Sequence, residues 1–235
     1  MITTILFDLD GTLLPMDQDI FLKAYLGGLA KKGVAHGYDA ASLPRQVMAG
    51  TVAMVKNDGS FPNEEVFWNT FSDLCGRDVR QDIAIFEDFY RSEFQEIRKV
   101  CGFDPRASEA IREIRELGYR VSLATNPLFP AIATHSRARW AGLNPEDFDL
   151  ITTYENARHC KPNPAYYQDV LDSLGAKAEE CLMVGNDVDE DMVAEKLGMK
   201  VFLLTDCLIN KSGADIDLYP HGSFPELMAF VRNLK

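Results

Sequence analysis

The segment Thr3-Thr4-Ile5-Leu6-Phe7-Asp8-Leu9-Asp10-Gly11-Thr12 decides the fold of this chain. Its first half, up to Phe7, is a short apolar run with β-branched residues, which is typical of a parallel strand buried on both faces. Two aspartates follow at once, and Gly11 ends the strand in a turn. Because ligands of open α/β sheets bind at the carboxyl ends of the strands, this segment predicts an α/β protein with a site at that edge.

The rest of the chain divides into a helical part and an alternating part. From about residue 17 to 99, apolar residues recur at helical spacing, as at Phe67, Phe71 and Leu74, and no strand-like pattern interrupts them. From about residue 100 onward, strand-like and helix-like segments alternate. The expected helices are 105–117, 130–141, 164–174, 189–197 and 225–234, and the further expected strands are 119–124, 148–153, 181–184 and 200–204.

This alternation predicts βαβ units, and hence a mostly parallel sheet that is covered on both faces. We therefore expect an α/β fold with a Rossmann-like parallel sheet core, helices on both faces, and an inserted α-helical cap domain. The core would comprise residues 1–16 and 100–235, and the cap residues 17–99. The cap is expected to act as a lid over the site.

Composition narrows the class of protein. The chain has 235 residues and a formal net charge of −12, so nucleic acid is not an expected partner. Its five cysteines are odd in number and widely spaced, which indicates reduced thiols in a cytoplasmic protein rather than disulfides or a zinc site. No stretch is apolar and long enough to span a membrane, so no membrane association is expected. The sequence gives no indication of the oligomeric state.

Polar side chains follow each of the first four predicted strands, where the carboxyl ends of a parallel sheet converge. In chain order they are Asp8, Asp10 and Thr12, then Thr125 and Asn126, then Lys161, and finally Asn186, Asp187 and Asp191.

The pair Asp8 and Asp10 carries the most specific chemistry. A carboxylate is a competent nucleophile toward phosphorus, and a second one nearby can protonate the leaving oxygen and later activate water. Two such acids repel each other unless a cation lies between them. Mg²⁺ suits this place, because it prefers carboxylates and substrate phosphate as ligands. The alternative is an Asp-Gly turn with incidental acids.

The other segments each have a catalytic interpretation and an ordinary one. The Thr125 hydroxyl and the backbone amide of Asn126 would hold phosphoryl oxygens, or Thr125 makes a local hydrogen bond. Lys161, in a loop stiffened by prolines, would stabilise negative charge, or it is a solvated surface lysine. The acids of 185–191 would complete a metal site, or they cap a helix. The joint order of the four segments favours the catalytic interpretation.

These segments resemble the four motifs of the haloacid dehalogenase superfamily of hydrolases, including a helical cap inserted between the first and second motifs. The resemblance covers the whole chain. It implies that Asp8 is the nucleophile, Asp10 the general acid/base, and Thr125 and Lys161 the groups that bind and stabilise the phosphoryl group. Thr12 and Asn126 are expected to contact the substrate.

The resemblance also implies a Mg²⁺ ion, held by the Asp8 side chain, the Asp10 backbone carbonyl and an acid of the fourth motif. The family commonly has aspartate directly after the glycine of this motif, but here Asn186 stands there and Asp187 follows. Either Asn186 is a neutral ligand or Asp187 reaches the metal. Asp191 would orient a metal-bound water from behind the ligands.

The leading prediction is thus a Mg²⁺-dependent phosphomonoesterase of a small phosphorylated metabolite. Asp10 disfavours a dehalogenase, while a phosphomutase stays open. A phosphonate hydrolase would need a cap lysine, such as Lys23, Lys31, Lys32 or Lys56. Retention of Asp8 and Lys161 disfavours an inactive binding module.

The cap gives fewer indications. Arg45, Lys56 and Asn57 are candidate substrate contacts, and Phe129 and Pro130 candidate entrance residues. Helical spacing assigns Trp68 and the cap phenylalanines to the core.

Overall fold

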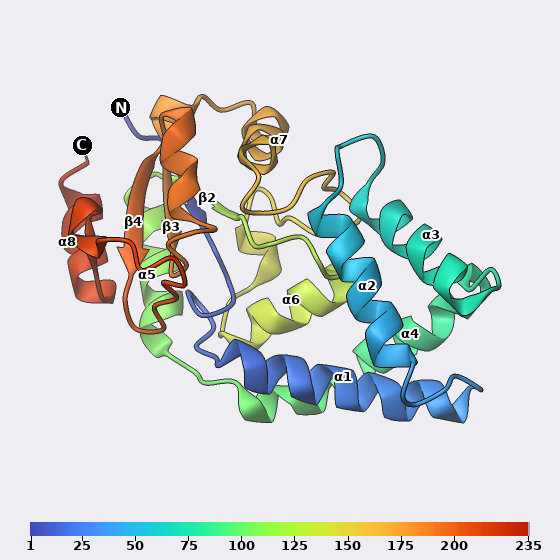
Figure 1. The fold of residues 1–235 in the computed structure, drawn as a ribbon. Helices are drawn as coiled ribbons and strands as arrows, with labels where there is room; N and C mark the ends of the chain where they lie inside the picture. Colours follow the sequence, from blue (N-terminus) through green and yellow to red (C-terminus); the bar gives the residue numbers. More distant parts are fainter. Residues whose placement is uncertain (235) are drawn as a thin grey trace.

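The computed structural model describes residues 1–234, in which a parallel five-stranded sheet lies beside a group of helices (Figure 1). The strand order is β2-β1-β3-β4-β5, and every neighbouring pair is parallel. The strands are β1 (Thr4–Phe7), β2 (Arg120–Leu123), β3 (Cys181–Gly185), β4 (Lys200–Leu204) and β5 (His221–Gly222). This is the Rossmann-like α/β core that the alternation predicted.

Strand β1 is central because it is apolar throughout. All four of its residues are buried, and it pairs with β2 on one side and β3 on the other. In this register Phe7 lies opposite both Leu123 and Val184. The residues that follow these three positions therefore emerge side by side at one edge of the sheet.

Helices cover both faces of the sheet, as the period-two alternation of strand side chains requires. Ile5 and Phe7 belong to a core with α5 and α8, whereas Leu6 packs on the opposite face with α7 and η5. The helices of this part are α5 (Pro105–Glu116), α6 (Ala131–Trp140), α7 (Pro164–Leu174) and α8 (Phe224–Arg232), with short 3-10 turns η3 (Pro145–Asp147), η4 (Ala178–Glu180), η5 (Met192–Leu197) and η6 (Ile216–Leu218).

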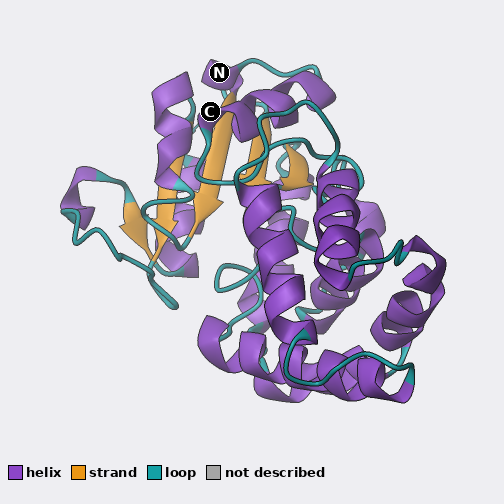
Figure 2. Ribbon diagram, turned by 45° about the vertical axis from the view of Figure 1, so that its right-hand side comes forward, coloured by secondary structure: helices purple, strands orange, loops and turns teal. Residues whose placement is uncertain are grey.

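Between β1 and α5 the described chain forms helices and no strand (Figure 2). They are α1 (Gln18–Ala35), α2 (Leu43–Val55), α3 (Asn63–Cys75), η1 (Arg80–Asp82), α4 (Ile83–Arg91) and η2 (Glu93–Val100). Asp17 starts α1 by accepting hydrogen bonds from two first-turn amides, both at 3.0 Å. Phe94 of η2 packs on Trp140 of α6, with ring centroids 5.0 Å apart. The division into a core and a cap domain stays a prediction.

The strand predicted at 148–153 is not regular. Ile151 makes one isolated bridge to Leu123, and three backbone hydrogen bonds of 2.8–3.0 Å join Asp149, Leu150 and Thr152 to β2. The pairing is too short to form a regular strand. The Asn156 side-chain amide donates to the Ile151 carbonyl at 2.9 Å and its oxygen accepts from the Thr153 amide at 2.8 Å, on the edge of the segment that faces away from β2.

The α-helix predicted at 189–197 is wrong, because the structure has a turn followed by a 3-10 helix there. A turn precedes the 3-10 segment η5, because the Asp187 carboxylate accepts from the amides of Asp189 and Glu190 at 2.8 and 3.0 Å. The strand β5 was not predicted, since two residues are too few to show a pattern.

Two predicted absences can be compared with the described chain. The five cysteines are free in residues 1–234. None of the helices formed by these residues has both the length and the apolarity needed to cross a bilayer.

Candidate active site

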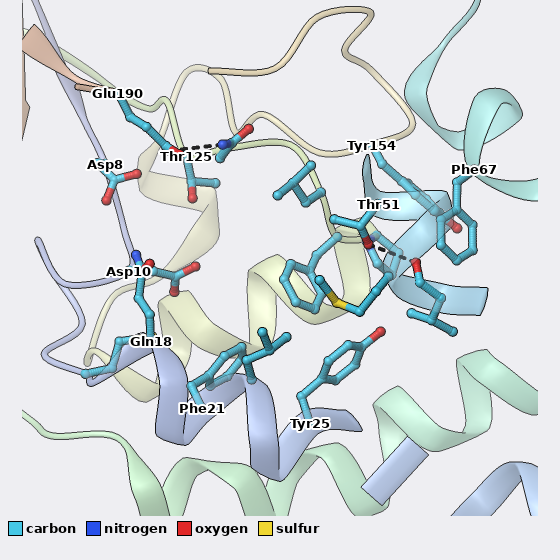
Figure 3. Close-up of a pocket in the computed structure, with 18 of the residues that line it drawn as sticks. Asp8, Asp10, Gln18, Phe21, Tyr25, Thr51, Phe67, Thr125, Tyr154 and Glu190 are labelled. Atoms are coloured by element: carbon cyan, nitrogen blue, oxygen red, sulfur yellow. Dashed lines mark hydrogen bonds between the residues drawn. The ribbon is translucent and has the colours of Figure 1, made fainter. Parts of the chain in front are cut away.

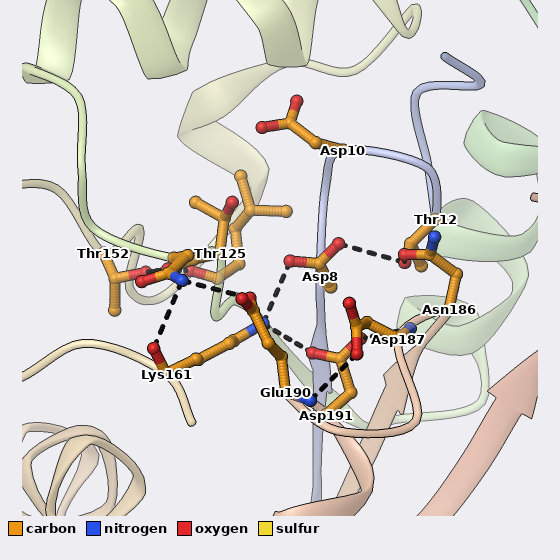
Figure 4. A network of polar contacts seen from close by, with 12 residues as sticks. Asp8, Asp10, Thr12, Thr125, Thr152, Lys161, Asn186, Asp187, Glu190 and Asp191 are labelled. Carbon is orange, nitrogen blue, oxygen red and sulfur yellow. Dashed lines mark hydrogen bonds and ion pairs between the residues drawn. The ribbon is translucent and has the colours of Figure 1, made fainter. Parts of the chain in front are cut away.

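Asp8 lies directly after β1 and is held from both sides (Figure 4). Its backbone amide donates to the Val184 carbonyl at 2.9 Å, which fixes the carboxylate at the sheet edge. Oδ1 accepts from Lys161 Nζ at 2.9 Å, and Oδ2 lies 3.1 Å from the Thr12 hydroxyl. The Asp8 carboxylate is therefore fixed in orientation while it still faces the cavity described below.

Lys161 is fully buried and bridges two carboxylates. Besides Asp8, it donates to Asp191 Oδ1 at 2.7 Å. Burial alone would lower the pKa of Lys161, but the charges of Asp191 and Asp8 raise it well above its ordinary value. Lys161 therefore stays cationic beside Asp8, and its burial excludes the alternative of a solvated surface lysine.

The Asp10 carboxylate is turned away from Asp8 (Figure 4). It forms an ion pair with Arg137 of α6. Its Oδ2 takes this bond, whereas Oδ1 is buried and makes no hydrogen bond within residues 1–234. Burial raises the pKa of Asp10, although Arg137 acts in the opposite direction. A raised pKa and one unpartnered oxygen suit a group that must both give and take a proton.

Thr125 and Asn126 follow β2 and line the same cavity. The Thr125 carbonyl is held by the Thr152 and Tyr166 hydroxyls at 2.6 and 2.9 Å. The Thr125 hydroxyl itself has no partner in the described chain, so it is free to bind a ligand. The Asn126 side chain donates to Glu190 Oε2 at 3.0 Å.

Asn186 and Asp187, the two alternative metal ligands, differ in side-chain orientation. Asn186 Nδ2 donates to the Cys207 carbonyl at 2.7 Å, so its oxygen Oδ1 faces Thr12, 2.8 Å from the hydroxyl. The Asp187 carboxylate instead caps the turn that begins η5. Asn186 thus turns an oxygen toward Thr12, whereas one of the two Asp187 oxygens is used within the turn.

Asp191 lies behind the ligands. Its Oδ1 accepts from Lys161, and its Oδ2 accepts from the Asp187 amide at 3.0 Å. Asp191 is 1% exposed, and these two bonds hold Lys161 and the 186–187 turn in place.

The donor set fits Mg²⁺. The single proton of Thr12 lies within reach of both Asp8 Oδ2 and Asn186 Oδ1, and it can satisfy only one of them at a time. A cation near these two oxygens would satisfy the other. Residues 1–234 contain no group of three or more His, Cys, Asp or Glu side chains placed to hold a metal. Mg²⁺ does not require one, because it binds through one or two carboxylates and keeps several waters.

Gly11 allows this arrangement. Its φ is +89°, and a Cβ there would lie 2.4 Å from Asn186 Nδ2. A glycine is therefore needed both for the left-handed turn and for the close approach of the Asn186 amide to the Asp10–Gly11 backbone.

A cavity of about 250 Å³ opens from these residues toward the helices of 18–100 (Figure 3). Asp8, Thr125 and Glu190 lie at one end, and Phe21 and Tyr25 of α1 lie toward the other. Burial raises the pKa of Glu190 to about 7, with Asp191 adding to the effect and Lys161 opposing it. The cavity is the place where a ligand would meet Asp8.

The structure brings together every predicted site residue, and their roles stay predictions. They are Asp8, Asp10, Thr12, Thr125, Asn126, Lys161, Asn186, Asp187 and Asp191.

Of the residues predicted as substrate contacts or entrance residues, only some line the cavity. Arg45 and Lys56 are exposed and lie outside the cavity lining. Asn57 is bound internally to Asn63 at 2.9 Å. Phe129 and Pro130 do line the cavity, and Trp68 both lines it and is buried in the core.

Two residues were missed. Glu190 stood within the fourth motif but carried no separate signal, and Arg137 is an arginine in an ordinary helix. Nothing in the sequence around Arg137 indicates that it contacts Asp10.

Comparison with known proteins decides the family. The model of the haloacid dehalogenase-like hydrolases matches residues 2–198. The chain belongs to this family. It is therefore a phosphatase-like hydrolase, as the four motifs suggested.

Relatives and solved structures agree with the family. A Bacillus cereus protein named pyrophosphatase PpaX is 27% identical over 199 residues, covering 85% of this chain and 81% of the relative. The structure of a phosphatase of the family from Thermococcus onnurineus matches at a TM-score of 0.62 and 19% identity, covering 98% of both chains. That of a predicted phosphoglycolate phosphatase from Haemophilus somnus matches at 0.60 and 18% identity, covering 97% of both. The structural matches support the fold alone.

Proposed function

We propose that this protein is a Mg²⁺-dependent phosphomonoesterase that forms an aspartyl-phosphate on Asp8. The observation that carries the proposal is the environment of Asp8. One carboxylate oxygen is paired with the buried Lys161 at 2.9 Å, and the residue faces a cavity that Asp10 also lines. A carboxylate fixed beside a permanent cation is placed to attack a phosphate ester.

In the first step, an Asp8 carboxylate oxygen attacks phosphorus and the bond from phosphorus to the alcohol oxygen breaks. The leaving oxygen takes a proton from the Asp10 carboxyl group, whose Oδ1 is unpartnered in the described chain. Because the pKa of Asp10 is raised by burial, its protonated form is accessible for this transfer.

In the second step, water attacks the phosphorus of the aspartyl-phosphate. Asp10, now a carboxylate, takes a proton from that water, and the bond from Asp8 to phosphorus breaks. Inorganic phosphate leaves, and both aspartates return to their starting forms. Arg137 holds Asp10 in place through both transfers.

Two groups stabilise the phosphoryl group. Lys161 balances the negative charge of the Asp8 carboxylate as one of its oxygens attacks phosphorus. The Thr125 hydroxyl is free to donate a hydrogen bond to a phosphoryl oxygen. Mg²⁺ would be held by Asp8, the Asp10 backbone carbonyl and Asn186, and it would supply Lewis-acid neutralisation of the phosphate.

The alternatives are weaker on this geometry. None of the four candidate Schiff-base lysines of the sequence lines the cavity in the described chain, which disfavours a phosphonate hydrolase. A phosphomutase would use the same Asp8 chemistry, but it would return the phosphoryl group to the substrate. Release of inorganic phosphate therefore distinguishes a phosphomonoesterase from a phosphomutase. The same chemistry would also cleave pyrophosphate, the substrate that the name of the Bacillus relative implies. The residues that line the rest of the cavity must therefore select which leaving group is bound.

The test is phosphate release from a panel of phosphate esters, with Mg²⁺ and with EDTA, by the wild type and Asp8→Asn. We expect Mg²⁺-dependent release, lost on the order of 10³-fold or more in Asp8→Asn. Asp172→Asn, an exposed aspartate on α7, is the matched control. Mass spectrometry of the acid-quenched wild type should show one added phosphoryl group on Asp8. Equal activity of wild type and Asp8→Asn would refute the mechanism.

A further inference from the structure

The two ends of the cavity differ in chemical character (Figure 3). The end at the sheet edge carries the carboxylates, including Asp8 and Glu190. The other end is walled by aromatic and aliphatic side chains from α1–α4 and from the loop after β2, among them Phe21, Phe67 and Phe129. A leaving group attached to a phosphate at Asp8 would therefore occupy the apolar end.

No lysine, arginine or histidine is among the lining residues in the described chain. Two cations beside the site are each bound to carboxylates. Lys161 lies between Asp8 and Asp191, and Arg137 is bound to Asp10 beneath the ring of Phe129. The apolar end thus offers no positive charge to a second anionic group.

The hydroxyl and indole groups at that end are neutral, and each makes a hydrogen bond within the described chain. The Tyr25 and Tyr90 hydroxyls are 2.9 Å apart, and Trp68 Nε1 donates to the Tyr154 hydroxyl at 3.4 Å. Thr51 donates to the Val47 carbonyl within its own helix, at 3.1 Å. These hydroxyl oxygens can still accept a hydrogen bond, so they suit a substrate with few polar groups.

The apolar end of the cavity favours an apolar leaving group over a charged one. A second phosphate or a carboxylate would lose its hydration in this end without a counterion, which is strongly unfavourable. An apolar body would instead remove its own surface and that of the wall from water. Aromatic groups would gain further from edge-to-face contact with rings such as Phe21.

We propose that the substrates are small phosphate monoesters whose leaving alcohol is uncharged and largely apolar, with an aromatic or branched aliphatic body. The inference rests on the proposed phosphomonoesterase function and narrows its substrate class. It sets pyrophosphate, sugar phosphates and phosphorylated acids aside as preferred substrates. The volume of about 250 Å³ is below the ~300–1,000 Å³ usual for drug-sized ligands, which limits the substrate to a small molecule.

The first experiment compares kcat/KM of the wild type for benzyl phosphate and isobutyl phosphate with that for pyrophosphate, glucose 6-phosphate and phosphoglycolate, all with Mg²⁺. We expect at least ~10-fold higher values for the two apolar esters. If pyrophosphate, glucose 6-phosphate or phosphoglycolate is cleaved as fast as the apolar esters, the proposed substrate class is wrong. The proposed phosphohydrolase chemistry at Asp8 would still stand.

A pair of variants tests the cause. Met48 lies in α2, half-buried, and lines the cavity, whereas Val52 lies in the same helix, is 46% exposed and does not. Met48→Lys should reduce the preference for benzyl phosphate over pyrophosphate by about tenfold or more, because it adds a cation to the wall. Val52→Lys should leave the preference unchanged. Equal effects of the two variants would overturn the explanation.

Binding to Asp8→Asn separates this inference from the proposed reaction. Calorimetry with benzyl phosphate and with pyrophosphate reports the leaving-group site without turnover. Tighter binding of benzyl phosphate supports the apolar site even if the wild type releases no phosphate from any ester. Equal or tighter binding of pyrophosphate overturns it.

Discussion

The guanidinium of Arg137 forms an ion pair with the carboxylate of Asp10 from a helix that is remote in the sequence. Arg137 is 1% exposed, and its guanidinium carbon lies 4.3 Å from the ring centroid of Phe129. The ion pair and the stacking together fix where the proposed acid/base sits. Helix α6 thus serves the site without lining the cavity with a cation.

Replacing Arg137 with methionine should leave the Asp10 carboxylate buried without a counterion. Removal of one partner of a buried pair costs about 3–5 kcal/mol in the free energy of unfolding. We expect a loss in this range for Arg137→Met, measured by urea denaturation at pH 7. Arg139→Met, on the exposed side of the same helix, should change the stability by less than about 0.5 kcal/mol.

The double variant Asp10→Asn/Arg137→Met distinguishes a charge effect from lost packing. If the ion pair matters as stated, the double variant should be more stable than Arg137→Met alone, because no buried charge is then left unpaired. A double variant at least as unstable as the sum of the single ones would show that Arg137 acts through packing alone.

Lys161 gives a second prediction, since it separates two carboxylates. Lys161→Met leaves Asp8 and Asp191 buried with no cation between them, and we expect the free energy of unfolding to fall by about 3–5 kcal/mol. Adding Asp191→Asn should recover part of that loss. Phosphate release should stay abolished in both variants, which separates the structural role of Lys161 from the catalytic one. Recovery of activity in the double variant would contradict the proposed charge stabilisation.

The sequence predicted much of the site because strand ends converge. Asp8 and Thr125 each follow a short buried run, and parallel pairing of those runs is enough to bring the two residues together. Lys161 was also placed correctly in the group, although the segment expected to deliver it, 148–153, pairs only briefly with β2 and forms no regular strand. Order along the chain was therefore more reliable than the secondary structure of the connecting segment.

What the sequence did not predict depends on side-chain orientation. The charge of Asp187 favoured it as a metal ligand, but the sequence does not show that its Oδ1 accepts hydrogen bonds from two amides of its own turn. No periodicity separates Arg137 from a surface arginine, because its partner is 127 positions away. Such contacts between distant segments are fixed by tertiary packing and leave no local pattern.

The orientation of Asn186 gives a third prediction, on metal affinity. With Oδ1 toward Asp8 and Thr12, Asn186→Ala should weaken Mg²⁺ binding on the order of 10–100-fold. Asp187→Asn should leave it nearly unchanged, since asparagine caps a turn about as well as aspartate does. Mg²⁺ titration followed by calorimetry measures both. A large loss in Asp187→Asn with little change in Asn186→Ala would reverse the assignment.

Glu190 gives a fourth prediction, on stability as a function of pH. Burial raises its pKa from 4.5 to about 7, so between these values the folded chain holds a proton that the unfolded chain has lost. The free energy of unfolding therefore falls as the pH rises through this window, and the penalty is complete above about pH 7. Glu190→Gln removes the titration and keeps an oxygen for the Asn126 amide.

We expect Glu190→Gln to match the wild type near pH 5 and to exceed it near pH 8 by about 1–2 kcal/mol. For a chain of this size that corresponds to a rise in Tm of ~2–8 °C at the higher pH. Thermal unfolding in EDTA measures the effect without bound metal. Glu195 is exposed on η5, so the stability of Glu195→Gln should change with pH in the same way as that of the wild type. Parallel profiles for Glu190→Gln as well would show that the Glu190 carboxyl titrates normally, because a group with the same pKa in the folded and unfolded chains contributes no pH dependence.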